Sequence, residues 1–437
     1  MNRFFFPTRP RASRALGFLA LAAMGVLAGC GGGSSSSTTS TTVSTTTLSS
    51  TVNAQKVVVD GLPFVNSVYT GLPNALYTTV NICLPGSTTA CQAVFNVQVD
   101  TGSSGLRLLS SAVYIPLTAN KDSGGNTISN CGRFSDGSVQ WGVMSTANVQ
   151  VAGEIASSVP IQLIGAANSP AQPAGCASGV ITDRPPLAAG ANGILGIGMR
   201  KQDCGAPCAS AALPSPVTYF TCGSVGCAPT PVALANQLQN PVALFPQDNN
   251  GVVLQLPAIG DQGSNSMTGT LLFGIATQSN NNNFLGAAQI QTPDANGHFI
   301  TTFNGVAYAN SYFASGARAI YFPSASLPVC LASAAITGLY CPTATQNFSA
   351  LVTDVNKVSS NVAFSVANPV ALLQFAFGLN RAFNNLGGPA PSATGFIWGM
   401  PFFYGRSVYV AIEGQTVTTS TISAVTTTST TGPFIAF

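Results

Sequence analysis

Charged side chains are scarce in this sequence. Its 437 residues include 15 Lys or Arg and 12 Asp or Glu, so only 6% of the chain is charged. A typical soluble domain carries about 25% charge, and proteins that bind nucleic acid cluster Lys and Arg against the phosphates. The composition therefore excludes an ordinary charged domain, a highly charged disordered chain and a nucleic-acid partner. The first 14 positions hold four of the basic residues, which leaves 11 basic and 12 acidic residues in a nearly neutral remainder.

Long apolar runs are missing after residue 30, where no run approaches the ~20 residues of a membrane-spanning helix. Before it, a basic segment precedes the apolar stretch 15–27 and then Ala28-Gly29-Cys30, which is the pattern of a secretory signal peptide. Residues 27–30 resemble the lipobox of bacterial lipoproteins. The resemblance implies removal of the signal peptide 1–29 and acylation of Cys30 as the lipid anchor. An ordinary signal peptide with a chance cysteine is the alternative.

The segment after Cys30 is uncharged and rich in Gly, Ser and Thr from residue 31 to residue 51. Such a composition predicts a flexible tether, which we place at residues 30–56. Gly31 resembles the residue found in lipoproteins that are passed on to the outer membrane. We therefore expect a protein of the bacterial cell envelope, held by lipid at the outer membrane, on its periplasmic face or at the cell surface.

Ten cysteines follow Cys30, and an even number in an exported protein favours disulfides. Four pairs are close in sequence, and a fifth would form a longer link. Zinc is the alternative for two of the pairs, although their spacing differs from the usual Cys-x2-Cys. The candidate pairs are Cys83 and Cys91, Cys131 and Cys176, Cys204 and Cys208, Cys222 and Cys227, and Cys330 and Cys341.

Helical periodicity is rare in the rest of the chain. It occurs around 369–383 and, more briefly, around 232–238, whereas short alternating apolar runs separated by Gly, Pro, Asn and Ser fill the remainder, as at 94–99 and 252–256. This pattern predicts a mostly β fold with a few short helices.

Residues 97–106 place Asp100 at the end of an alternating strand, in a Gly-containing turn that reads Asp-Thr-Gly-Ser-Ser. Apolar segments with glycine follow at 193–198, 270–275 and 395–401. Together these motifs resemble the bilobal pepsin-like aspartic peptidases, and also a group of bacterial lipoproteins with the same turn. The resemblance implies a double-β, two-lobed architecture, with lobes at 57–285 and 286–437. A β-sandwich or barrel with a chance turn is the alternative.

In that family each lobe supplies one Asp-Thr/Ser-Gly turn, braced by an apolar-apolar-Gly segment. Asp100, Thr101, Gly102 and Ser103 match the first turn, and 194–196 matches its brace. The second turn matches residues 312–323, but Ala314 stands at the aspartate position and Ala317 at that of a supporting hydroxyl residue. Ser315 and Gly316 retain the rest of the turn, and Ser315 matches Thr101 in a link between the lobes.

A lone aspartate weakens the case for catalysis. The family's mechanism holds a water between two carboxyl groups that share one proton, and each general acid or base contributes about 10²–10⁴-fold. With Ala314 the coupled pair is lost. We therefore favour a degenerate peptidase that binds a peptide or an envelope protein in its cleft, without metal or cofactor. An active endopeptidase that pairs Asp100 with another carboxylate, and a structural β-rich surface protein, are the alternatives; the oligomeric state is open.

The family's flap, a hairpin that covers the substrate, matches 134–142. Phe134 takes the place of the flap tyrosine, Gly137 lies in the turn, and Arg107 falls where the tyrosine's tryptophan partner usually lies. Trp141 either covers the cleft or packs in a core.

Two further candidates are interpreted as turns. Asp122 begins a literal Asp-Ser-Gly, but polar residues flank it and no strand supports it. His298 is the only histidine, and it follows Asn296-Gly297 in what resembles a hairpin. A Ser-His-Asp triad would have to use it, and the sequence has no Gly-x-Ser-x-Gly elbow.

Overall fold

The computed structural model describes residues 53–61, 64–65, 68–69, 72–166, 169–177, 190–281, 288–331, 336–374, 379–420 and 427–437. All of them belong to one compact unit, Leu48–Phe437. The predicted signal peptide, the lipid anchor Cys30 and most of the tether lie outside the described residues, and those assignments stay predictions.

Helices are short throughout the described ranges. They are α1 (Ala174–Ala177), α2 (Ala206–Ala209), α3 (Pro369–Gln374) and α4 (Met400–Phe403). None is long and apolar enough to cross a membrane. Of the two segments with helical periodicity, 369–383 is helical only over α3 in its described part. The other contains only the short 3₁₀ turn Leu234–Asn236, in which Leu234 is exposed.

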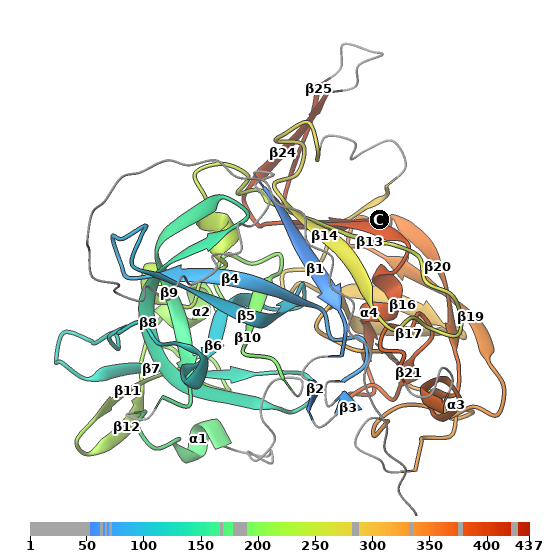
Figure 1. Cartoon of the computed structure of the whole chain (residues 1–437), viewed down its shortest axis with the longest axis horizontal. Helices are drawn as coiled ribbons and strands as arrows, with labels where there is room; N and C mark the ends of the chain where they lie inside the picture. Colours follow the sequence, from blue (N-terminus) through green and yellow to red (C-terminus); the bar gives the residue numbers. More distant parts are fainter. Residues whose placement is uncertain are drawn as a thin grey trace, which may run out of the picture. The chain divides into compact units, whose positions relative to one another are not determined.

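The larger sheet has 15 strands in the order β12-β11-β7-β8-β9-β6-β10-β5-β4-β1-β14-β13-β23-β26-β15 (Figure 1). β4 also pairs with β8, so the strands from β8 to β4 close into a ring. The bounds are β1 (Ala54–Val59), β4 (Tyr77–Cys83), β5 (Cys91–Asp100), β6 (Ser104–Leu109), β7 (Thr127–Arg133), β8 (Val139–Val151), β9 (Glu154–Ile164), β10 (Gly193–Ile197), β11 (Tyr219–Gly223), β12 (Gly226–Pro229), β13 (Gly251–Leu256), β14 (Met267–Phe273), β15 (Ile290–Gln291), β23 (Arg406–Ala411) and β26 (Phe434–Ala436).

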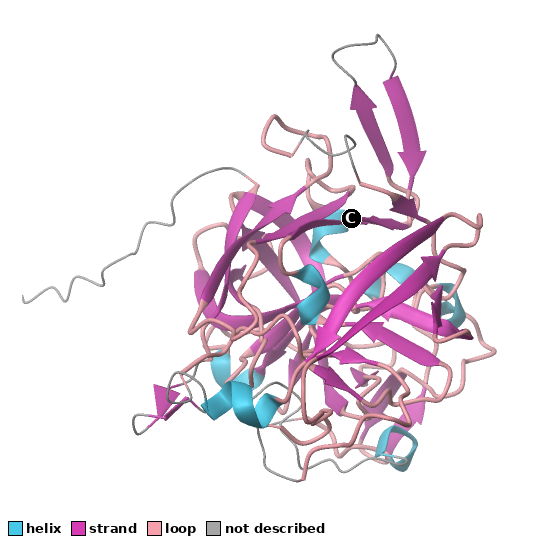
Figure 2. Cartoon of the chain, turned by 90° about the vertical axis from the view of Figure 1, so that its right-hand side faces the viewer, coloured by secondary structure: helices cyan, strands magenta, loops and turns pink. Residues whose placement is uncertain are grey.

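The second sheet has seven strands in the order β20-β19-β16-β17-β22-β18-β21, all from the C-terminal part of the chain. Its labelled strands lie on the right-hand side of Figure 1, which is the side that faces the viewer in Figure 2. Two short hairpins, β2–β3 and β24–β25, complete the described strands. The remaining bounds are β2 (Phe64–Val65), β3 (Val68–Tyr69), β16 (Phe299–Phe303), β17 (Val306–Phe313), β18 (Ile320–Tyr321), β19 (Gln346–Thr353), β20 (Ser359–Val366), β21 (Gly387–Gly388), β22 (Gly395–Trp398), β24 (Thr416–Ser420) and β25 (Thr427–Thr431).

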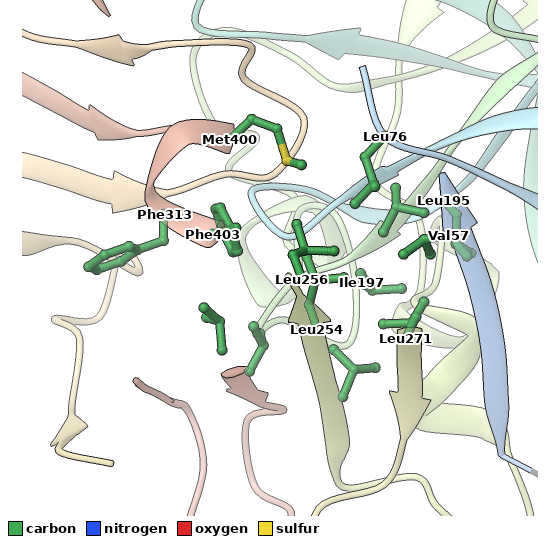
Figure 3. Packing of buried hydrophobic residues seen from close by; sticks show 14 of the residues in the cluster. Val57, Leu76, Leu195, Ile197, Leu254, Leu256, Leu271, Phe313, Met400 and Phe403 are labelled. Atoms are coloured by element: carbon green, nitrogen blue, oxygen red, sulfur yellow. The ribbon is translucent and has the colours of Figure 1, made fainter. Parts of the chain in front are cut away.

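One continuous core joins the two sheets. Its buried side chains include Val57 and Leu195 from the larger sheet and Phe313 and Met400 from the second half of the chain, and Figure 3 shows them in one packed region. The predicted mostly β, two-lobed fold with a few short helices is confirmed. The boundary near residue 285 and the pepsin-like relationship stay predictions.

Five disulfides join the ten cysteines that follow Cys30. The prediction is confirmed in each case, so the sulfur atoms proposed as zinc ligands are bonded to one another. The bonds are Cys83–Cys91, Cys131–Cys176, Cys204–Cys208, Cys222–Cys227 and Cys330–Cys341.

Candidate functional site

The Asp100 turn joins two strands of the larger sheet. β5 ends at Asp100, and β6 leaves the turn at Ser104. β10 lies between them, parallel to β5 and antiparallel to β6, with Gly196 opposite Asp100. Because the brace strand bonds to both the entering and the leaving strand, it fixes the direction in which the turn projects.

The same arrangement recurs in the second sheet. β17 ends at Phe313, β18 leaves the turn, and β22 lies between them, parallel to β17 and antiparallel to β18. Phe313 lies opposite Trp398, and the Ala314 N–H donates to the Trp398 carbonyl at 3.0 Å. Ala314 and Gly399 are the residues that directly follow this Phe313–Trp398 pair. Ala314 therefore corresponds to Asp100, and Gly399 corresponds to Gly196.

The two turns exchange hydrogen bonds through their hydroxyl residues. The Thr101 N–H donates to Ser315 Oγ at 3.1 Å, and the Ser315 N–H donates to Thr101 Oγ1 at 3.0 Å. Each hydroxyl also donates to the strand that enters the other turn: Ser315 Oγ to the Val99 carbonyl at 2.8 Å, and Thr101 Oγ1 to the Phe313 carbonyl at 3.3 Å. Since all these groups are buried, the exchange locks the turns together.

Asp100 is 7% exposed, and its carboxyl group accepts hydrogen bonds on both oxygens. Oδ1 receives the Gly102 N–H at 2.8 Å and the Gly316 N–H at 3.2 Å. Oδ2 receives the Ser103 hydroxyl at 2.6 Å. One oxygen is thus held by a backbone amide from each turn, which fixes the carboxyl plane over the contact between them.

A methyl group occupies the position across from Asp100. A Cβ added to Gly102 would lie 2.7 Å from Ala314 Cβ, and one added to Gly316 would lie 2.6 Å from Asp100 Cγ. Real side chains do not approach so closely, so both turns need glycine. Ala317, which corresponds to Ser103, has no hydroxyl. Within the described residues, the groups that hydrogen-bond to the Asp100 carboxylate include no second carboxyl group.

The predicted flap is a hairpin between β7 and β8. Phe134 and Ser138 close it through the Phe134 N–H to Ser138 carbonyl bond at 3.0 Å, and Gly137 takes a positive φ of 83° in its turn. The Arg107 guanidinium lies 5.9 Å from the centre of the Phe134 ring. The structure thus brings together the two residues that the resemblance paired.

Behind the hairpin, Arg107 belongs to a buried polar cluster that the sequence did not reveal. It forms an ion pair with Asp203 at 3.2 Å and donates to Asn130 Oδ1 at 2.7 Å and to Gln162 Oε1. Asp203 also accepts the Tyr219 hydroxyl at 2.6 Å. Burial lowers the pKa of Arg107 and raises that of Asp203, and their mutual attraction opposes both shifts. The cluster supports the base of the hairpin and leaves no free group for chemistry.

Tyr312 connects the hairpin to the second turn. It lies two residues before Ala314, and its hydroxyl donates to Ser135 Oγ at the hairpin tip at 2.5 Å. Burial raises the pKa of Tyr312 to about 12; the Ser135 bond opposes the shift, and the carboxylates of Asp100 and Asp136 add to it. In the sequence, only the position of Tyr312 two residues before Ala314 indicated that it lies near the site.

Trp141 lies away from the Asp100 carboxyl group's contacts. Its indole N–H donates to the Pro170 carbonyl at 2.8 Å, and its ring meets Phe220 edge-on at 5.6 Å, beside the Cys131–Cys176 bond. The sequence left open whether Trp141 covers the cleft or packs in a core, and these contacts are those of a core residue.

The other two candidates lie in turns. Asp122 accepts the N–H groups of Gly124 and Asn126 on one carboxylate oxygen, in the polar turn that its flanking residues predicted. His298 follows a turn closed by Asp294 and is half-buried rather than exposed; its ring lies 6.3 Å from that of Tyr312.

In the described ranges, no three His, Cys, Asp or Glu side chains gather as a metal site would require. The arrangement therefore offers one oriented carboxyl group, two glycine turns and a hairpin bonded across them.

A family model described as "protein of unknown function (DUF3443)" matches residues 49–437, and the chain belongs to this family. No curated protein matches the sequence. The matched segment contains both turns, the hairpin and all five disulfides, so the candidate site lies entirely within the family's shared region.

Proposed function

We propose that this member of the DUF3443 family is an envelope-anchored protein of pepsin-like architecture that has lost peptidase catalysis and binds a peptide, or an extended segment of an envelope protein, in the cleft beside Asp100. The observation that carries the proposal is the pairing of Asp100 with Ala314 across two turns that exchange hydroxyl bonds.

The repeated strand arrangement supports the equivalence of the two positions. Asp100 lies opposite Gly196, and Ala314 directly follows the Phe313–Trp398 pair in a second set of strands with the same directions. The second turn therefore lacks a carboxyl group at the position that corresponds to Asp100 in the first turn. An aspartic peptidase needs both, because one carboxylate takes a proton from water while its protonated partner polarises the substrate carbonyl.

The rest of the site supports a binding role. The site retains the turn glycines, the hydroxyl exchange and the hairpin. Ordering these segments together costs conformational entropy. The Asp100 carboxyl group still offers its oxygens to donors such as a peptide N–H. The Tyr312–Ser135 bond holds the hairpin over the second turn, so an extended peptide would lie beneath it.

Two peptides test the proposal. One has an ordinary peptide bond, and the other carries a statine residue, whose hydroxyl mimics the tetrahedral intermediate between paired carboxyl groups. A working dyad binds such mimics about 10²-fold or more tighter than substrates. We expect the wild-type protein to bind both peptides with affinities within about threefold. A preference of 10²-fold for the statine peptide would contradict the loss of catalysis, and binding of neither peptide would contradict the cleft's role.

The double variant Ala314→Asp/Ala317→Ser is the matched comparison. It supplies the carboxyl group and the hydroxyl that the second turn lacks, and Gly102 leaves the same space beside position 314 that Gly316 leaves beside Asp100. We expect it to gain preference for the statine peptide, while Asp122→Asn, a change in the unrelated polar turn, leaves both affinities unchanged.

The location in the envelope is part of the same proposal and rests on residues 15–30. Cys30→Ser should move the protein from the membrane fraction to the soluble fraction and abolish incorporation of labelled fatty acid. Retention of both in the variant would contradict a lipid anchor.

An active peptidase is the second candidate function, favoured by one observation. Asp100 keeps its complete set of bonds, including the Ser103 hydroxyl at 2.6 Å, as a catalytic carboxylate would. This candidate requires a carboxyl group from elsewhere to reach Asp100 when substrate binds.

A further inference from the structure

A hollow of about 390 Å³ lies in the C-terminal part of the chain, bordered by β18, β19, β20, β22 and α4. Trp398, Phe402 and Tyr404 lie beneath it and are 0%, 2% and 5% exposed, so the protein itself covers these rings. Phe348 and Phe364 are half-buried and form the accessible aromatic part of the lining. No lining residue belongs to the Asp100 turn, to the Ala314 turn or to the hairpin, so the hollow is distinct from the proposed cleft.

The rings in the lining are fixed by their own contacts. Phe364 meets Trp398 edge-on at 5.5 Å, and the Tyr404 hydroxyl donates to the buried Asn74 Oδ1 at 2.9 Å, so this hydroxyl is already used within the protein. The volume is within the range of small-molecule sites, about 300–1,000 Å³, which are mostly apolar with a few polar groups. Preformed aromatic walls favour a ligand that contains a ring.

One cation borders this hollow. Arg406, the first residue of β23, lies with its Cζ 4.7 Å from the Phe402 ring centre and donates through Nη1 to the Phe402 carbonyl at 2.5 Å. It also lines a second hollow of about 390 Å³, next to Gln255 and Ser407. Arg406 therefore borders two cavities, and its guanidinium has further N–H donors beyond the one that Phe402 uses.

Arg406 has no ion-pair partner among the described residues. Burial lowers its pKa, and no neighbouring carboxylate opposes the shift. Neither hollow is lined by Asp or Glu. A half-buried cation without a counter-charge is costly, so the site is complementary to an anion. The buried Arg107, by comparison, has Asp203 as its counter-charge.

We propose that the hollow binds an aromatic carboxylate, whose ring lies against the half-buried rings of Phe348 and Phe364 and whose carboxylate pairs with the Arg406 guanidinium. The planar guanidinium presents parallel N–H donors that match the two oxygens of a carboxylate. A ring of one or two cycles fits the cavity, and an apolar body with a single anionic end matches the distribution of polar groups in the lining.

Calorimetric titration of the purified protein with naphthalene-2-acetate and with its amide tests the charge requirement. The two probes share a shape, but only the first is an anion. We expect the carboxylate to bind about tenfold or more tighter than the amide, since hydrogen bonds to charged groups are about twice as strong as neutral ones. Arg406→Gln should remove this preference, whereas Lys121→Gln, the same loss of charge on an exposed turn, should preserve it.

Two tryptophan variants on β20 test the location. Ala363 lines the hollow and Asn361, on the same strand, does not. Ala363→Trp should weaken binding about tenfold or more by filling the cavity, and Asn361→Trp should not. Circular dichroism and the melting temperature of each variant establish that it is folded.

Several outcomes would overturn the proposal: equal binding of the acid and the amide, unchanged binding by Arg406→Gln, no binding of the acid at millimolar concentration, or inorganic phosphate binding as tightly as the acid. Asp100→Asn should leave the titration unchanged, because this site does not depend on the proposed cleft function.

Discussion

Thr101 and Ser315 lie 214 positions apart in the sequence and exchange backbone-to-hydroxyl hydrogen bonds at 3.1 and 3.0 Å. Each hydroxyl serves the partner turn twice, as acceptor for its N–H and as donor to the strand that enters it. This exchange joins the two turns and holds Asp100 of the first turn next to Ala314 of the second.

Ser315→Ala should destabilise the protein by about 2–6 kcal/mol. The substitution leaves the buried Thr101 N–H and Val99 carbonyl without their partner, and each unsatisfied buried group costs about 1–3 kcal/mol. Urea unfolding measures the loss. Ser315→Thr keeps the hydroxyl and should lie close to wild type; a loss as large as that of the alanine variant would show that packing, rather than the hydroxyl, matters at this position.

Tyr312→Phe should make stability less sensitive to alkaline pH. The folded-state pKa of Tyr312 is raised from 10.0 to about 12, so the folded protein favours the neutral phenol. That contribution is fully present below pH 10 and is lost as the pH rises towards 12. Denaturant unfolding at pH 8, 10 and 11 measures it. A variant that loses as much stability as wild type between pH 10 and 11 would contradict the assignment, and Tyr114→Phe, at an exposed tyrosine, is the control.

Glu154→Gln should raise the melting temperature at pH 8 relative to wild type. Glu154 is buried at the start of β9 next to Asp248, and burial, followed by the Asp248 charge and hydrogen bond, raises its pKa from 4.5 to about 7. A raised folded-state pKa gives stability that is fully present below pH 4.5 and is lost as the pH rises through 7. Melting temperatures between pH 4 and 8 should therefore fall in wild type and change less in the variant. Equal slopes would contradict this.

Removal of the Cys131–Cys176 bond by a double alanine substitution should cost more stability than removal of Cys204–Cys208. The first closes a sequence separation of 45 residues and the second one of 4. Loop entropy predicts losses of about 4 and 2 kcal/mol, respectively. Urea unfolding of the two double variants gives the order, and a larger loss for the short loop would contradict the entropic explanation.

Local features of the site were predictable from the sequence. The alternation that ends at Asp100 predicts a strand and its turn, and the frame of residues 312–323 places Ala314, because both depend on neighbouring residues. The disulfides were predictable because four of the pairs are close in sequence. The pairing of Arg107 with Asp203 and that of Tyr312 with Ser135 were not, since 96 and 177 positions separate them and a single polar residue carries no signal of its distant partner.

The His298 environment and the Arg406 hollow were hidden for the same reason. His298 lies next to a turn, as its Asn-Gly neighbours predict, but it is half-buried and its ring lies near that of Tyr312 from β17, a residue distant enough in sequence to give no signal. Arg406 looks like an ordinary surface residue in the sequence, and only the meeting of α4, β20 and β23 leaves it without a counter-charge.

The most direct test of the central claim, that Asp100 has no catalytic partner, is the rate at which the purified protein cleaves unfolded, carboxymethylated casein between pH 3 and 6. We predict that wild type and Asp100→Asn release peptides at the same background rate at every pH. A wild-type rate at least tenfold above that of Asp100→Asn, with an acidic optimum, would contradict the account and establish a second carboxyl group at the site.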